Sequence, residues 1–103
     1  MNPKKHLRSF YEKAVADKKL NPSHVSVYMA LFQLWSENQY RNPISIERKE
    51  IMKLSRIKAL ATYHKCLKNL NDAGYIKYHP SFHPYKGSHV IIMKLTKKKS
   101  IPL

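Results

Sequence analysis

Apolar residues recur at intervals of three and four in two stretches near the start of the chain. Each stretch opens with an asparagine followed by a proline, at Asn2 and at Asn21, which suits an N-cap and the first position of a helix. The spacing predicts amphipathic helices over residues 3 to about 19 and about 23–39. Their apolar stripes are Leu7, Phe10, Tyr11, Ala14 and Val15, and then Val27, Tyr28, Leu31, Leu34 and Trp35.

The middle of the chain predicts one short strand and two further helices. Pro43 ends the second helix, because a proline disfavours helical backbone at the residue before it. Alternation of apolar and polar residues predicts a three-residue edge strand over 44–46, and helical spacing follows over 47–54 and again over 57–74. Gly74 suits the end of the last helix because it tolerates a left-handed backbone.

The helix over 57–74 has two faces of different character. The face expected to point inward holds Leu60, Tyr63, Leu67 and Leu70. The opposite face holds Lys58, Ala61, Thr62, Lys65 and Asn69. Substitution of Leu67 or Trp35, both expected in the core, should therefore destabilise the protein.

After Gly74 the apolar period shifts to two. This alternation predicts strands over 75–79 and 88–95, joined as a β-hairpin with a long tip that contains Pro80, Pro84 and Gly87. No internal repeat is found, and the length of 103 residues fits one domain. We expect an N-terminal helix in 1–20, a core in 21–95 and a basic tail in 96–103.

The string from Ile44-Ser-Ile to Gly-Tyr75-Ile resembles the winged helix-turn-helix superfamily in its order of strand, helix, turn, long helix and hairpin. The resemblance covers about residues 23–95. Within it the segment is similar to the N-terminal domains of replication initiators and DnaD-like proteins, and to small regulators on bacterial mobile elements. It implies an α+β winged helix with an added N-terminal helix and a C-terminal hairpin wing.

The charge of the chain points to a polyanionic partner. Twenty Lys and Arg against six Asp and Glu give a formal net charge of +14, which exceeds what solubility requires. Residues 44–74 hold seven basic and three acidic residues, and residues 75–103 hold six lysines and no acid. We therefore expect double-stranded DNA as the partner, with RNA as an alternative and a protein-interaction module as another.

The superfamily resemblance implies that the second helix of the motif enters the major groove. Lys58, Thr62 and Lys65 then lie on the outward stripe with Ala61 beside them, where lysine can bind guanine or phosphate and threonine a base. The alternative is that these lysines are ordinary solvated residues. The absence of any acid from residue 56 to residue 71 favours the interface.

Two further regions supply candidate phosphate contacts. Ser55 and Arg56 lie at the turn before the long helix, whose N-terminus attracts anions. Lys77 and Lys86 lie in the acid-free hairpin, and Lys86 at its tip is the first choice for a wing contact. Phe82 and Tyr85 in the tip are expected to pack on the domain and are not assigned to the site.

Metal binding, catalysis and membrane attachment are not expected. The spacing of half a zinc finger is present in Cys66, His79 and His83, and His64 could add a fourth ligand. No partner cysteine precedes Cys66, so we do not expect a zinc site. The six carboxylates show no catalytic spacing and two glycines form no phosphate loop, so we expect neither an enzyme nor a cofactor. A single cysteine and no signal peptide suit the cytoplasm.

A homodimer on DNA is expected, because one recognition helix covers only a few base pairs. Two apolar surfaces remain for pairing: Leu7, Phe10, Tyr11 and Val15 on the first helix, and the run 90–93 on the hairpin. The alternative is that the first helix packs on its own hairpin and leaves a monomer.

Overall fold

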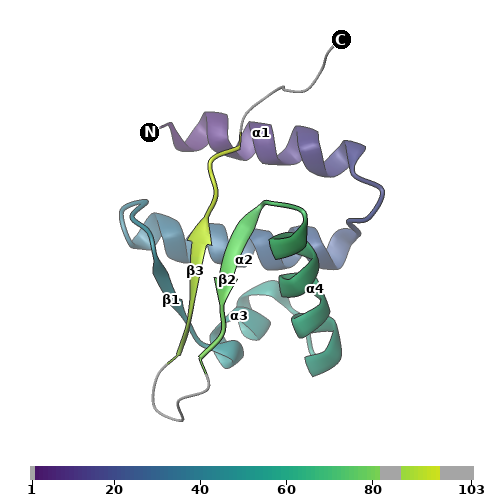
Figure 1. Ribbon diagram of the computed structural model, residues 1–103, viewed down its shortest axis with the longest axis vertical. Helices are drawn as coiled ribbons and strands as arrows, with labels where there is room; N and C mark the ends of the chain where they lie inside the picture. Colours follow the sequence, from purple (N-terminus) through teal and green to yellow (C-terminus); the bar gives the residue numbers. More distant parts are fainter. Residues whose placement is uncertain (1, 82–86, 96–103) are drawn as a thin grey trace.

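The protein combines four α-helices with one three-stranded antiparallel sheet over the residues that the structure describes (Figure 1). The structure is a computed structural model, and it describes residues 2–81 and 87–95. The elements are α1 (Pro3–Ala16), α2 (Pro22–Glu37), β1 (Ile44–Ile46), α3 (Arg48–Ser55), α4 (Leu60–Asp72), β2 (Ile76–His79) and β3 (Ser88–Ile92). The α+β class expected from the sequence is confirmed. The basic tail expected over 96–103 lies outside the described residues.

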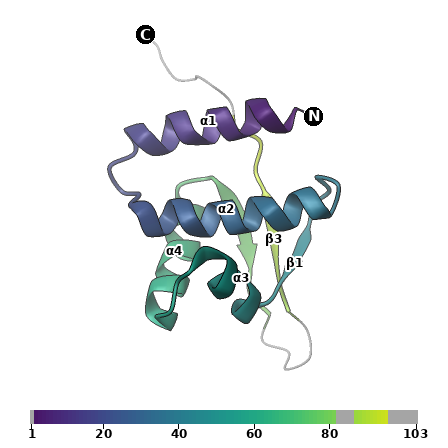
Figure 2. The ribbon, with the colours of Figure 1, turned by 180° about the vertical axis from the view of Figure 1, so that it is seen from behind.

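The first two helices begin at the expected caps and end earlier than expected. The Asn2 side chain accepts from the Lys5 backbone N–H, and the Asn21 side chain accepts from two backbone N–H groups of α2 in a capping box with His24. Helix α1 ends at Ala16 because Asp17 turns the chain, accepting the Lys19 N–H on its own side chain at 3.0 Å. The two helices then run antiparallel, one above the other (Figures 1 and 2).

The sheet has the order β1-β3-β2, so β1 is an edge strand as expected. Alternation sends Ile44, Ile46, Ile76, Val90 and Ile92 to the helical side and leaves Ser45, Lys77, His79 and His89 exposed. Asn42 extends the β1 edge: its side-chain amide donates to the Ile92 carbonyl and accepts from the Ile92 N–H, both at 3.0 Å. One side chain thereby satisfies both backbone groups of a strand residue.

Helices α3 and α4 each end in a Schellman motif. Tyr75 N–H donates to the Leu70 carbonyl around Gly74, whose φ is +87°, as expected for a left-handed position. Ile57 N–H donates likewise to the Met52 carbonyl around Arg56, whose φ is +63°. The motif at the end of α3 includes residues 55–57. Helix α4 therefore begins at Leu60, and not at Ile57 as the spacing predicted.

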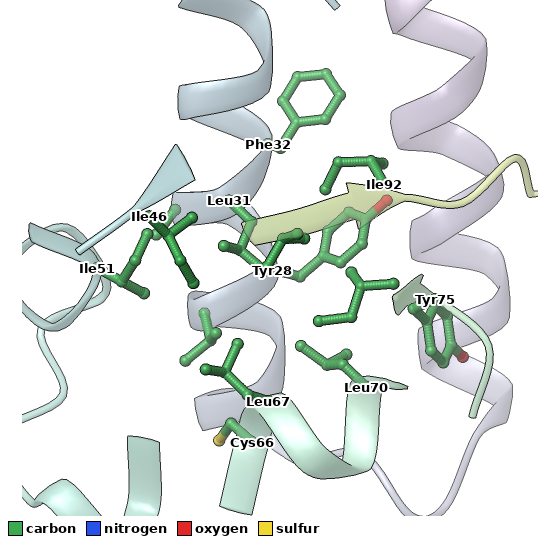
Figure 3. Packing of buried hydrophobic residues seen from close by; sticks show 14 of the residues in the cluster. Tyr28, Leu31, Phe32, Ile46, Ile51, Cys66, Leu67, Leu70, Tyr75 and Ile92 are labelled. Carbon is green, nitrogen blue, oxygen red and sulfur yellow. The ribbon is translucent and has the colours of Figure 1, made fainter. Parts of the chain in front are cut away.

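The core lies between α2, the inner face of the sheet and the apolar sides of α1, α3 and α4 (Figure 3). Trp35 is 5% exposed and Leu67 is fully buried, so both expected core positions are confirmed. The inward face of α4 consists of Tyr63, Cys66, Leu67 and Leu70. Leu60 was expected on this face but is 45% exposed, because it is the first residue of the helix and lies beyond the core.

Helix α1 packs on its own chain through aromatic side chains. The Phe10 ring stacks on Tyr28 at 3.7 Å between centroids, and the Tyr75 hydroxyl donates to the Asp17 carboxylate at 3.2 Å. The amino group of Lys13 lies 5.8 Å from the centre of the Tyr75 ring. Phe10 is thus not available for a second subunit, whereas Tyr11 and Val15 on the outer side of α1 remain exposed.

Candidate nucleic-acid interface

One stripe of α4 faces solvent along almost the whole helix. It consists of Ala61, His64, Lys65 and Lys68, whose positions follow the spacing of three and four that brings side chains to one helix face. Thr62, at the edge of the stripe, is half-buried. Of the predicted reading residues the structure therefore places Ala61 and Lys65 on this stripe and Thr62 beside it.

Lys58 does not belong to the helix, contrary to the sequence prediction. It precedes the N-cap residue Ala59 and is exposed in the segment between α3 and α4. There Lys53, Arg56 and Lys58 surround an open hollow of about 470 Å³, which Met52 and Ile57 also line. Three cationic side chains at one turn raise the positive potential around it, which favours an anionic group nearby.

The hollow lies next to the start of α4, and no side chain among the described residues caps that start. Ala59 is the N-cap residue and the first turn carries no acid, so the first backbone N–H groups lack a side-chain partner. The positive end of the helix dipole adds to the charges of Arg56 and Lys58. Phosphate is the ligand that such a combination of free N–H groups and cations favours.

The other end of α4 is less positive. Lys68 donates to Asp72 at 2.8 Å, which raises the pKa of the lysine and lowers that of the carboxyl, and both side chains are more than half exposed. This pair balances its own charge, whereas Lys65 has no acid within four residues on either side. Uncompensated positive charge is therefore concentrated at the α3–α4 turn and the first half of α4.

Ser55 is not a phosphate contact, contrary to the prediction from its place at the turn. It is 2% exposed, its hydroxyl donates to the Ile51 carbonyl at 2.6 Å, and its own carbonyl accepts from the Ser26 hydroxyl. The side chain faces inward because Ser55 is the last residue of α3 and lies one helical turn after Ile51. Ser55 holds the turn against α2.

A second hydrogen bond fixes α4 itself against α2. His24 is 2% exposed and its Nε2 lies 2.8 Å from the Asn69 side-chain oxygen. Asn69 had been expected on the outward face, but it is half-buried by this contact. The stripe and the turn are therefore held on a rigid support, which a precise contact with a partner requires.

The hairpin contributes differently from the helix. Lys77 is exposed on the outer face of the sheet, where it lies opposite Ile91. The next pair on the same face is His79 opposite His89. Lys86, the hairpin-tip contact expected from the sequence, lies outside the described residues, as do Phe82, His83 and Tyr85.

Cys66 and the histidines do not converge where the structure describes them. Cys66 is buried in the core, where burial raises the pKa of its thiol, while His64 occupies the exposed stripe. In residues 2–81 and 87–95 no three His, Cys, Asp or Glu side chains are grouped so that they could hold a metal ion. The candidate site is thus a surface that combines cationic side chains with the backbone N–H groups at the start of α4.

Comparisons of the chain with protein-family models, with curated proteins and with solved structures found no match. Within the described part of the chain, none of the helices has the length and apolar character needed to cross a membrane.

Sequence reasoning missed three exposed residues of this surface: Lys53, His64 and Lys68. The signal for His64 and Lys68 was present, since both continue the spacing of Ala61 and Lys65 by one helical step. It was hidden because Leu60 was expected to face inward and Asn69 outward, whereas Leu60 is exposed and Asn69 bonds the buried His24. Lys53 belongs to α3, and only the fold brings it to the hollow with Arg56.

Proposed function

We propose that this chain is a winged-helix protein that binds double-stranded DNA, with α4 in the major groove. The observation that carries the proposal is the acid-free stripe of Ala61, His64 and Lys65 on α4, which begins beside three cationic side chains. A major groove about 12 Å wide admits one helix and exposes base edges to its outward side chains. In this docking the positive first half of α4 enters the major groove most deeply.

The roles of the side chains follow from their positions. Lys65 reaches guanine acceptors or a phosphate, Thr62 a base or a thymine methyl group, and Ala61 permits close approach. Arg56, Lys58 and Lys53 hold the backbone phosphate that flanks the groove. His64, between Ala61 and Lys65, adds a donor or acceptor that the sequence reasoning did not assign.

The β2–β3 hairpin acts as the wing in this proposal. Its described part carries Lys77 and no acid between residues 76 and 92, so it can follow a neighbouring phosphate backbone. Lys86 is the proposed tip contact. Loss of Lys77 should weaken binding uniformly over sequences, because phosphate contacts carry no base information.

The biological role is proposed from the resemblance stated for residues 23–95. It is transcriptional regulation or replication control on a bacterial mobile element, in the cytoplasm, by a non-enzymatic protein without a cofactor. A homodimer bound to a site with two halves is part of this proposal.

Alanine substitution along α4 tests the proposed reading surface. After selection of a bound duplex from a random pool, Lys65→Ala and Thr62→Ala should each weaken binding by about 1 to 3 kcal/mol and relax base preference, without a change in melting temperature. Fluorescence anisotropy measures the affinity. Lys4→Ala is the matched control, since it removes one exposed lysine from α1.

Two outcomes would reject this assignment. Equal affinity of wild type and all α4 variants for the selected duplex would place the interface elsewhere. Preferential binding of folded or single-stranded RNA over duplex DNA in competition would replace DNA by RNA as the partner.

A further inference from the structure

The start of α4 presents apolar side chains to solvent. Ala59, Leu60 and Ala61 follow one another there and all three are exposed, Leu60 to 45%. Within the described part of the chain, Leu60 is the large hydrophobic residue of α4 that remains exposed. It belongs neither to the core nor to the half-buried hydrophobic residues that pack against the core. Packing among the described residues therefore does not account for a leucine at this position.

Cationic side chains precede and follow this apolar segment. Lys58 comes directly before it in the chain, and Lys65 lies one helical turn after Ala61 on the same face. Leu60 lies one turn before His64, so it continues the exposed stripe of α4 to the start of the helix. A single exposed leucine is ordinary on a protein surface. Leu60 differs because it lies within the surface proposed to meet DNA.

The chemistry of the major groove decides what an apolar side chain can meet there. Base edges present hydrogen-bond donors and acceptors, and the apolar group among them is the C5-methyl group of thymine. A leucine that covers a donor or acceptor removes it from water without offering a hydrogen bond in return, which costs free energy. Against a methyl group the same leucine buries apolar surface, which is favourable. An apolar helix start in the groove therefore fits thymine better than the other three bases.

We propose that Leu60 contacts the C5-methyl group of a thymine and makes the protein prefer thymine at the base that faces the start of α4. This inference rests on the proposed docking of α4 in the major groove. The small side chains of Ala59 and Ala61 allow the helix start to approach the base edges. Thr62 also carries a methyl group, but it is half-buried and bears a hydroxyl, so Leu60 offers the larger apolar surface at this end.

Replacement of single thymines by deoxyuridine tests the contact, because uracil lacks the methyl group and keeps the same hydrogen-bonding edge. The probe is a duplex selected from a random pool with the wild-type chain. Fluorescence anisotropy gives the ratio of the affinities for the thymine and uracil versions at each position. For the wild type we expect a position at which loss of the methyl group weakens binding about threefold to fivefold, the effect of one buried methyl-sized group.

Leu60→Ala should reduce the thymine-to-uracil ratio at that position to about one, because the apolar contact is gone. It should keep the melting temperature of the wild type, since Leu60 does not pack on the core and alanine forms helix as well as leucine does. Leu54→Ala is the matched control. Leu54 is also 45% exposed but lies on α3, so its loss should leave the ratio at that position as in the wild type.

Three results would overturn the inference while DNA binding stands. The first is a bound duplex in which no thymine can be replaced by uracil with loss of affinity. The second is a ratio that persists in Leu60→Ala, and the third is a ratio that Thr62→Ala removes and Leu60→Ala does not. Failure of the wild type to bind any duplex is a different outcome, which would reject the proposed function and this inference with it.

Discussion

At the scale of single residues, Arg56 joins a backbone constraint to a proposed contact. Its φ of +63° lies in the left-handed region, which costs a side-chain-bearing residue about 1 to 2 kcal/mol. Glycine is the usual residue at this position of a Schellman motif. The structure thus uses an unfavourable residue at the turn where a cation would contact phosphate.

Arg56→Gly should therefore separate stability from binding. Relief of the left-handed backbone offsets the entropy that glycine adds to the unfolded chain, so we expect a free energy of unfolding within about 1 kcal/mol of the wild type. Affinity for duplex DNA should fall, since one phosphate contact is lost. Thermal unfolding and anisotropy measure the two quantities on the same samples.

Arg56→Ala is the matched control. It removes the same cation but retains a Cβ in the left-handed region, as the wild-type arginine does, so it should bind DNA as weakly as Arg56→Gly and unfold at about the temperature of the wild type. A glycine variant with undiminished affinity would exclude Arg56 from the interface.

His6 gives the protein a pH-dependent contribution to stability. Its ring is buried against Trp35 and Phe32, with Nε2 2.6 Å from the Tyr28 hydroxyl, and burial lowers its pKa from the ordinary 6.5. Burial also raises the pKa of Tyr28, so its hydroxyl stays protonated beside the neutral ring. The folded state therefore favours an uncharged His6.

The sign of the pH effect follows from this lowered pKa. The unfolded chain binds the proton more readily, so the stabilisation is complete above about pH 6.5 and is lost as the pH falls toward the lower folded pKa. We expect the melting temperature to drop between about pH 7.5 and about pH 5. In His6→Gln, which does not titrate, that drop should be smaller. An equal drop in both proteins would assign the effect to other groups.

At the scale of elements, the hairpin depends on one close approach. A Cβ on Gly87 would lie 2.7 Å from the Ile46 carbonyl oxygen, so β3 can pair with the end of β1 only because residue 87 has no side chain. The Ile46 carbonyl oxygen is a backbone atom, so it cannot move without moving β1.

Gly87→Ala should therefore separate β1 from β3 and cost about 1 to 3 kcal/mol of unfolding free energy. Urea unfolding followed by circular dichroism measures the loss. Lys94→Ala, an exposed position shortly after β3, is the control and should change stability by less than about 0.5 kcal/mol. A Gly87→Ala protein as stable as the wild type would show that the strands can shift apart without cost.

The elements were largely predictable from the sequence because their signals are local. Asparagine caps, the Gly74 turn and the alternation at 44–46 each fix an end or a period within a few residues. The start of α4 was not, since Arg56 takes a left-handed conformation that nothing in its residue type announces. That one error moved Lys58 off the helix. The shift of the reading stripe toward His64 and Lys68 has another cause, since Cys66 and Asn69 face inward and Leu60 does not.

The candidate site was predictable only in part, for a related reason. Arg56, Ala61 and Lys65 were assigned because exposure and charge follow from residue type and helical spacing. Ser55 and Asn69 were misjudged because their partners, Ser26 and His24, are distant in the chain and belong to another helix. Contacts of that kind are set by tertiary packing.

At the scale of the whole molecule, the fold divides the surface into regions of different chemistry. The α3–α4 turn and the first half of α4 carry uncompensated cations, an open groove between α1 and α2 is lined mainly by apolar side chains such as Tyr11 and Val15, and the outer face of the sheet carries Lys77 with two histidines. At a net charge of +14, the cationic turn is the part of this surface on which the proposed DNA contact rests.

The salt dependence of binding to duplex DNA tests the central claim most directly. If Arg56, Lys58, Lys53, Lys65, Lys77 and Lys86 each neutralise one phosphate, the logarithm of the association constant should fall linearly with the logarithm of salt concentration, with a slope of about −5 for each bound copy of the chain. Removal of Arg56 or Lys65 should reduce that slope by about 1, and Lys4→Ala should leave it unchanged. Absence of binding at low salt, or an affinity that salt does not alter, would contradict the account.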